Sequence, residues 1–207
     1  MNFTYPVRVA KPGLRRQVEC FWATPPALAE TALLNTWSAR TDDVKANDAA
    51  EFAKLATQKW ELTCRFGTVV GSIAELEAAV REEPKAEVTA MLLAGAPWFD
   101  ASIIGMCLFH RTWANNIFID YISAHPDCFA ESEPISGVGP GLLFQVCEAA
   151  LRLNCATIWA ETTPTSALSY QEFFKAPEAT DRLVVDQKMM TAFRDSMSEK
   201  WRSPAGP

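Results

Sequence analysis

The chain has 207 residues, of which 49% are hydrophobic and 21% charged, and its formal net charge is −6. This size and composition are typical of a globular protein, and we expect one domain over residues 1–207. The acidic balance argues against nucleic-acid binding, because neutralising phosphates requires a surplus of Lys and Arg.

The sequence also argues against a membrane protein and against a metal site. It contains no run of about 18 apolar residues, and its first residues, MNFTYPVRVAKPG, do not form a signal-peptide pattern. We therefore expect a cytoplasmic protein that does not bind membranes. The six cysteines are scattered and the chain has only two histidines, a pattern that favours reduced, buried thiols and no metal.

Helix signals dominate residues 1–84, and we predict a variable, largely helical part here. Pro84 stops the last of these helices. Three helix starts are predicted from residues that suit the first turn: Thr24 before Pro25 and Pro26, Asp48 with Glu51, and Ser72 with Glu75.

The pattern changes after Pro84 to short β-branched and aromatic runs separated by turn residues. We predict three consecutive antiparallel strands in residues 87–95, 102–113 and 117–124. A helix in 140–154, a strand in 156–162, a helix in 162–175, a strand in 181–187 and a final helix in 188–201 follow. Thr163 is expected to cap the helix that Pro164 begins. Residues 85–190 would form the core, and 202–207 a flexible tail.

A glycine-rich segment precedes the helix expected in 140–154. Gly137, Gly139 and Gly141 would let a phosphate come close to the backbone N–H groups of a helix start. A P-loop does not fit, because Leu142 and Leu143 follow the last glycine where Lys and Ser or Thr are needed. The dinucleotide-binding fingerprint fits poorly, because the final glycine spacing differs and the preceding strands are predicted to be antiparallel.

Four segments together resemble the GNAT superfamily of acyl-CoA-dependent N-acyltransferases. They are IFIDYISAHPDCF, SGVGPGLLFQVCEAALRLNC, ATIWAETTPTSALSYQEFF and RLVVD, and the resemblance spans about residues 102–186. It implies an α+β fold with a mixed, mainly antiparallel sheet flanked by helices. It also implies transfer of an acetyl or other acyl group from acyl-CoA to an amine by direct attack.

The resemblance further implies a set of site residues. Acetyl-CoA would be bound by its pyrophosphate and by its pantetheine arm, and Tyr170 would be the general acid for the leaving thiolate. The implied cofactor-binding residues are Val138, Gly139, Gly141 and Leu142 for the pyrophosphate, and Ile122, Ser123 and Ala124 for pantetheine.

Candidates for the base that deprotonates the amine are Asp120 and Glu161, each near the end of a predicted strand. His125, in a turn before Pro126, is a weaker candidate for the base, and the simpler interpretation is an exposed residue. For His110 we expect a structural or exposed position. Three tryptophans could shape an acceptor pocket, although large aromatics are first of all core material. They are Trp98, Trp113 and Trp159.

The sequence leaves a second function open, a catalytically degenerate acyl-CoA sensor or protein-interaction module. Ser136 stands where the family motif has Arg or Gln, and Pro140 lies inside the loop. The segment between Pro126 and Gly139 is about seven residues longer than the corresponding turn of the family. The acceptor would be a small-molecule or peptide amine, and a homo-oligomer is left open.

Overall fold

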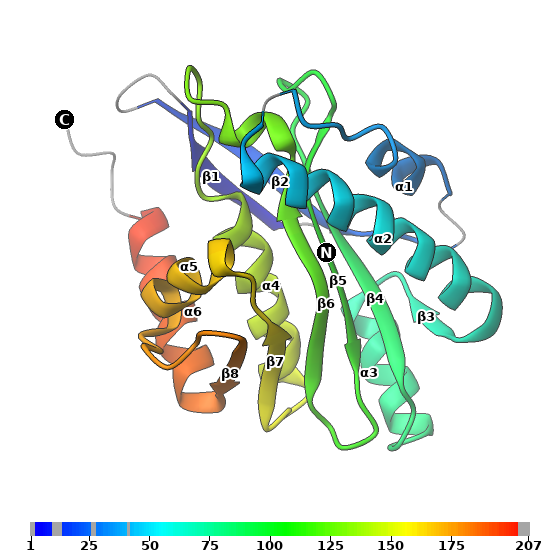
Figure 1. Ribbon diagram of the computed structural model, residues 1–207. Coiled ribbons are helices and arrows are strands. Elements are labelled where there is room, and N and C mark those ends of the chain that lie inside the picture. The colour runs from blue at the N-terminus through cyan, green and yellow to red at the C-terminus, as the bar shows by residue number, and fades with distance from the viewer. Residues whose placement is uncertain (1–2, 10–13, 26–27, 41, 203–207) are drawn as a thin grey trace.

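The computed structural model describes residues 3–9, 14–25, 28–40 and 42–202. Within these ranges, eight strands form one sheet in the order β1-β2-β4-β5-β6-β7-β8, with β3 paired to β4 beside β2 (Figure 1). Only the pairs β3–β4 and β6–β7 are parallel among them. The strands are β1 Phe3–Arg8, β2 Arg15–Trp22, β3 Thr68–Val70, β4 Val88–Gly95, β5 Ile103–Arg111, β6 Ile117–Ala124, β7 Thr157–Glu161 and β8 Arg182–Asp186.

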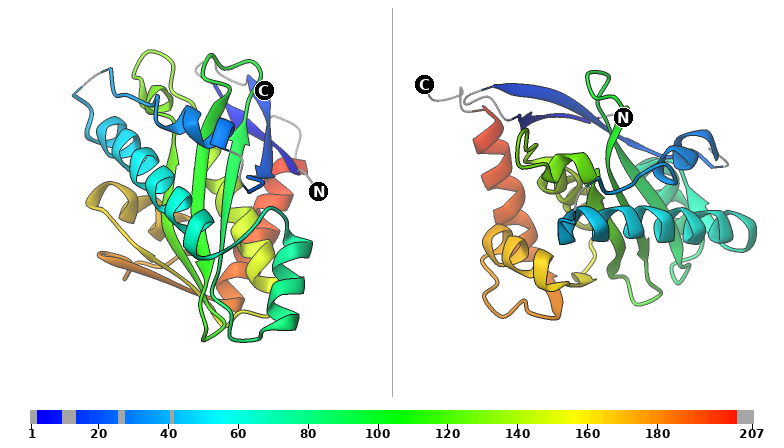
Figure 2. Two further views of the ribbon diagram at one scale, coloured as in Figure 1. Left: turned by 90° about the vertical axis from the view of Figure 1, so that its right-hand side faces the viewer. Right: turned by 45° about the horizontal axis from the view of Figure 1, so that its top comes forward.

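Helices cover both faces of this sheet (Figures 1 and 2). One hydrophobic cluster joins the sheet to α1 and α2, and a second joins it to α3, α4, α5 and α6. The expected fold class, a mixed and mainly antiparallel sheet flanked by helices, is confirmed. The helices are α1 Leu28–Leu34, α2 Val44–Phe66, α3 Ile73–Glu82, α4 Val138–Arg152, α5 Pro164–Phe174 and α6 Gln187–Arg202, with a short 3-10 helix η1 at Pro126–Phe129.

The predicted elements after Pro84 are all present. β4, β5 and β6 are consecutive antiparallel strands, and helices lie on both sides of β4 and β5, which explains their almost continuous burial. Thr163 caps α5 by accepting a hydrogen bond from the Ser166 N–H. Arg202 belongs to α6 rather than to the expected tail, and residues 203–207 lie outside the described part of the chain.

The expectation for residues 1–84 was wrong in two respects. First, three strands, β1, β2 and β3, accompany the helices there. Second, α2 begins at Val44 instead of near Asp48, because the Asp43 carboxylate accepts a hydrogen bond from the Ala46 N–H at 3.0 Å. Ser72 caps α3 as predicted. Of the start signal around Thr24, Pro26 lies outside the described residues.

α4 is the central helix of its layer. Its apolar residues are buried, and two residues of its narrow polar stripe pair with neighbouring helices. Arg152 contacts Glu77 of α3 at 2.8 Å, and Glu148 contacts Arg194 of α6 at 3.6 Å. Five of the six cysteines are buried and all six are free thiols, as expected. Among the described residues, no helix is long and apolar enough to cross a membrane.

An aromatic cluster connects the two ends of the described chain to α4. Phe3 stacks on Phe144 of α4 with ring centroids 5.0 Å apart, and Trp201 of α6 lies 4.9 Å from the same ring. Trp201 also lies 5.7 Å from the Tyr5 ring of β1. β1, α4 and α6 are thereby fixed to one another close to the start of α4.

Candidate functional site

β6 and β7 separate after a short stretch of parallel pairing. The paired residues run from Ile117 with Ile158 to Ile119 with Ala160, and beyond them β6 continues alone, as Figure 1 shows. Residues 120–124 pair with β5 on their other side. Within the described residues, the edge of 120–124 that faces β7 therefore has no strand partner, and we call it the open edge of β6. Such an edge can bind an extended ligand through backbone hydrogen bonds.

The start of α4 lies beside β1, which the sequence analysis did not predict. Arg8 and Ser136 exchange two backbone hydrogen bonds, at 2.9 and 3.0 Å. The Tyr5 hydroxyl donates to the Val138 carbonyl at 3.2 Å. Gly137 precedes the helix with φ of 103°, a left-handed conformation that favours glycine. β1 thus fixes the direction in which α4 begins.

The two glycines of the first turn have different surroundings. A Cβ on Gly141 would overlap the Tyr5 ring, whereas a Cβ on Gly139 would meet nothing within 4 Å. The Gly141 N–H already donates to the Gly137 carbonyl at 3.2 Å, and the Leu142 side chain is fully buried. In the first turn of an α-helix the N–H groups have no partner within the helix, and here these include the N–H groups of Val138 and Gly139.

A cavity of about 190 Å³ adjoins this helix start. Its lining contains three cationic side chains and no acidic one, although the chain as a whole is acidic. The positive end of the helix and these side chains together favour a phosphate-bearing ligand. The charged lining residues are Arg8, Arg15 and Lys200, and the apolar ones include Pro140, Phe173 and Trp201.

Tyr170 of α5 lies on the α4 side of the sheet with 6% of its surface exposed. Burial, and to a smaller extent the Cys107 thiol, raises the pKa of Tyr170 well above its ordinary value of 10.0. Tyr170 and Cys107 belong to one hydrophobic cluster, and Ile122 and Ala124 of the open edge pack against this cluster. Within the described part of the chain, the structure gives the Tyr170 hydroxyl no hydrogen-bond partner.

The two predicted carboxylates have different positions. Asp120 lies at a bulge in the β5–β6 pairing with 5% of its side chain exposed. Its Oδ1 accepts a hydrogen bond from Lys59 Nζ at 2.6 Å, and its Oδ2 lies 2.9 Å from His110 Nδ1. Glu161 is exposed at the end of β7, opposite Arg182. Of these two carboxylates, Asp120 belongs to a cluster of polar side chains with Lys59 and His110.

The contact between His110 and Asp120 was missed by the sequence analysis. Both residues belong to one hairpin, in which His110 pairs with Phe118. Residues two apart on a strand lie on the same face, so the hairpin register was the signal that could have found the pair.

His125 is not an exposed turn residue. Its ring is 7% exposed and lies between Trp37 and Phe99, with ring centroids 5.0 and 5.1 Å away. Nδ1 accepts a hydrogen bond from the Asp127 N–H at 3.1 Å, which caps η1. Burial lowers the pKa of His125 below its ordinary 6.5. These contacts give His125 a structural role.

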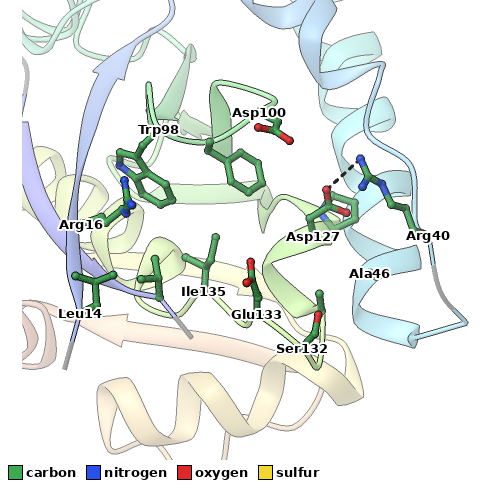
Figure 3. A pocket seen from close by; sticks show the side chains of 14 residues that line it. Leu14, Arg16, Arg40, Ala46, Trp98, Asp100, Asp127, Ser132, Glu133 and Ile135 are labelled. Carbon is green, nitrogen blue, oxygen red and sulfur yellow. Dashed lines mark ion pairs between the residues drawn. The ribbon is translucent and has the colours of Figure 1, made fainter. Parts of the chain in front are cut away.

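A larger cavity of about 530 Å³ lies at the end of the sheet, between β2, the β4–β5 connection, η1 and the start of α2 (Figure 3). Arg40 and Asp127 form an ion pair across it at 3.5 Å, and Arg16 lies over the Trp98 ring. Trp98 therefore lines this cavity and not the open edge. Trp113 and Trp159 are 66% and 43% exposed. Within the described ranges, no group of three or more His, Cys, Asp or Glu residues could hold a metal ion.

Comparison with known proteins finds similarity only among solved structures. No family profile and no curated protein matches the chain. Nourseothricin acetyltransferase aligns with 42% of this chain and 48% of its own, at 18% identity and a TM-score of 0.34. A streptothricin acetyltransferase from Bacillus anthracis, solved with acetyl coenzyme A, aligns with 47% of this chain and 59% of its own, at 20% identity and a TM-score of 0.33.

An acetyltransferase of the GNAT family from Staphylococcus aureus aligns with 55% of this chain and 76% of its own, at 14% identity and a TM-score of 0.37. The chain thus spans about half the length of the first two of these proteins. These likenesses concern the fold. The mixed, mainly antiparallel sheet with flanking helices is the architecture that the resemblance of the sequence implied.

Proposed function

We propose that the protein transfers an acyl group from acyl-CoA, its co-substrate, to an amine. The observation that carries this proposal is the open edge of β6, whose Ile122 and Ala124 pack against the hydrophobic cluster that contains Tyr170. The pantetheine amides would pair with the backbone of Ile122, Ser123 and Ala124 as an added strand would. The acyl group would then lie between β6 and α5.

The start of α4 would bind the pyrophosphate. The N–H groups of Val138 and Gly139 and the positive end of the helix favour its negative charge. Arg8, Arg15 and Lys200, which line the adjoining cavity, add cationic side chains. In this arrangement Gly141 serves the site indirectly, because its small size lets Tyr5 hold the helix start.

Transfer requires one bond to form and one to break. The amine nitrogen attacks the thioester carbonyl carbon, the C–N bond forms and the C–S bond breaks, so that the thiolate leaves. Tyr170 donates its proton to this thiolate and the amine gives up a proton to a base, which keeps the charge balanced. Burial raises the pKa of Tyr170 above its ordinary value of 10.0, so the phenol carries its proton at neutral pH.

Isothermal calorimetry of acetyl-CoA and free CoA tests the binding half of the proposal. Gly139→Glu adds a carboxylate at a position with open space around it, and Gly139→Gln is the matched neutral control. We expect saturable binding to the wild type and to Gly139→Gln, and about 10-fold weaker binding to Gly139→Glu. No binding to the wild type at millimolar ligand, or equal affinity for all three proteins, would contradict the proposal.

Release of free thiol from acetyl-CoA in the presence of amines tests turnover. The panel would contain small primary amines, a peptide with a free N-terminus and a peptide with a lysine side chain. We expect at least one amine to accelerate thiol release above the rate in buffer alone. Tight binding of acetyl-CoA with no acceleration by any amine would favour the alternative function, an acyl-CoA sensor or interaction module.

A further inference from the structure

Resting on the proposed acyl transfer, we infer that His110 takes the proton of the attacking amine and that Asp120 is its positioning residue. The sequence analysis suggested Asp120 itself as the base. The geometry assigns the two residues different roles, because Asp120 is enclosed and already bonded, whereas His110 has a ring nitrogen available.

Both carboxylate oxygens of Asp120 are occupied. Oδ1 accepts the bond from Lys59 Nζ at 2.6 Å and Oδ2 faces His110 Nδ1 at 2.9 Å, while only 5% of the side chain is exposed. An amine could reach this carboxylate only by displacing one of its two partners.

His110 meets the requirements of a proton acceptor. A carboxylate facing Nδ1 favours the tautomer with hydrogen on Nδ1, which leaves the lone pair on Nε2. Among the described residues, Nε2 has no hydrogen-bond partner, and 24% of the His110 side chain is exposed. The ring also packs on Phe118, with centroids 5.5 Å apart. An Asp–His pair of this kind orients the imidazole and stabilises the imidazolium that forms.

The pair lies where the proposed acceptor would meet the thioester. Asp120 is the first residue of β6 beyond the pairing with β7, and it lies at a bulge, a feature common beside active sites. Lys59 places the pair on the α2 side of the sheet, whereas Tyr170 belongs to the hydrophobic cluster of the α4 side. His110 would thus accept the amine proton on one side of the sheet, and Tyr170 would protonate the thiolate on the other.

The proton balance is complete within this arrangement. As the C–N bond forms and the C–S bond breaks, the amine proton moves to His110 Nε2 and the thiolate takes the Tyr170 proton. His110 then returns its proton to solvent, and the Tyr170 phenolate takes a proton back from solvent, which restores both residues. The charged groups that face His110 from the elements around it are Asp120 on β6 and, through Asp120, Lys59 on α2, while Thr89 lies opposite it on β4.

Nuclear magnetic resonance of ¹⁵N-histidine in the full chain tests the pair without any acceptor. The chain has two histidines, and the His125→Asn variant identifies the signals of His110. We expect the Nδ1–H tautomer in the wild type and loss of this preference in Asp120→Asn. An Nε2–H tautomer, or an imidazolium across the whole pH range in which thiol is released, would overturn the proposal.

Kinetics with an amine from the panel supply the second readout. We expect His110→Gln to release thiol about 100-fold more slowly and to lose the decline in rate on the acid side of the wild-type pH profile. Asp120→Asn should lower the rate about 10-fold or more with the acid-side decline displaced, and both variants should bind acetyl-CoA like the wild type. An unchanged rate and pH profile in His110→Gln would sink this inference, whereas absent acetyl-CoA binding in the wild type would sink the proposed function instead.

Discussion

The start of α4 and the open edge of β6 are neighbours that differ in how completely their polar groups are satisfied. At the start of α4, Tyr5 bonds to Val138 and Arg8 pairs with Ser136. Along the open edge, the β6 backbone lacks a strand partner and the Tyr170 hydroxyl has no bond among the described residues. The contrast separates residues that hold the structure from residues to which the proposed function assigns a ligand.

Tyr170→Phe should give the largest effect. The hydroxyl makes no hydrogen bond within the described structure, so its removal should leave stability and acetyl-CoA binding nearly unchanged. Loss of the general acid should slow thiol release about 100-fold. Thiol release and the thermal midpoint would be measured together. A lower thermal midpoint with an unchanged rate of thiol release would show that Tyr170 is a core residue. The contrast between the start of α4 and the open edge would then not hold.

Gly141→Ala should mainly reduce stability. The added methyl group would overlap the Tyr5 ring, and overpacking of this kind costs about 1–3 kcal/mol of unfolding free energy. Urea denaturation measures this loss. Gly139→Ala is the matched control, since open space surrounds that position, and it should change stability by less than about 0.5 kcal/mol. Equal stability of the two variants would mean that the first turn of α4 is not fixed by β1.

Tyr5→Phe should have a smaller effect in the same region. It keeps the ring against Gly141 and removes only the hydrogen bond to the Val138 carbonyl. We expect a loss of about 0.5–1.5 kcal/mol in unfolding free energy, again by urea denaturation. A stability equal to that of the wild type would show that the bond adds little to the packing of the ring.

His125→Asn removes the ring contacts with Trp37 and Phe99 and should lower stability at every pH, and the smallest effect we predict is a change in how stability depends on pH. Burial lowers the pKa of His125 in the folded state, so below about 6.5 the unfolded chain binds more protons and stability falls as the pH is lowered. Asn can still accept the bond from the Asp127 N–H. Between pH 7.5 and 5.5, the variant should therefore lose less unfolding free energy than the wild type. Parallel losses in both proteins would contradict a buried neutral histidine.

The sequence predicted the elements whose signals are local. The β4–β6 hairpins follow from β-branched runs between turn residues, and α5 follows from Thr163 and Pro164. β1 and β2 were missed because β2 begins with Arg15, Arg16 and Gln17 and finds its partner β4 far along the chain. At α2, both Asp43 and Asp48 are suitable capping residues, and a local pattern does not choose between them.

For the candidate site, the sequence predicted individual residues but not the contacts between them. Tyr170 and the helix-start glycines followed from a sequence resemblance, but their contacts did not. The partnership of His110 and Asp120 depends on the β5–β6 register, which the sequence analysis did not work out. The role of Gly141 depends on Tyr5, a residue of a strand that the sequence analysis did not find. Long-range contacts, which a local sequence pattern does not reveal, therefore determine which of the candidate site residues lie in contact.

The contacts of Tyr5 in β1 with α4 and α6 also have a consequence during synthesis of the chain. Tyr5 and Val138 lie 133 positions apart, and Trp201, which packs on the Tyr5 ring, follows much later. The Tyr5–Val138 bond cannot form until α4 has left the ribosome, and the contact with Trp201 cannot form until α6 has. Until then the Tyr5 ring lacks these partners, and exposed aromatic surface of this kind is where chaperones bind and aggregates grow.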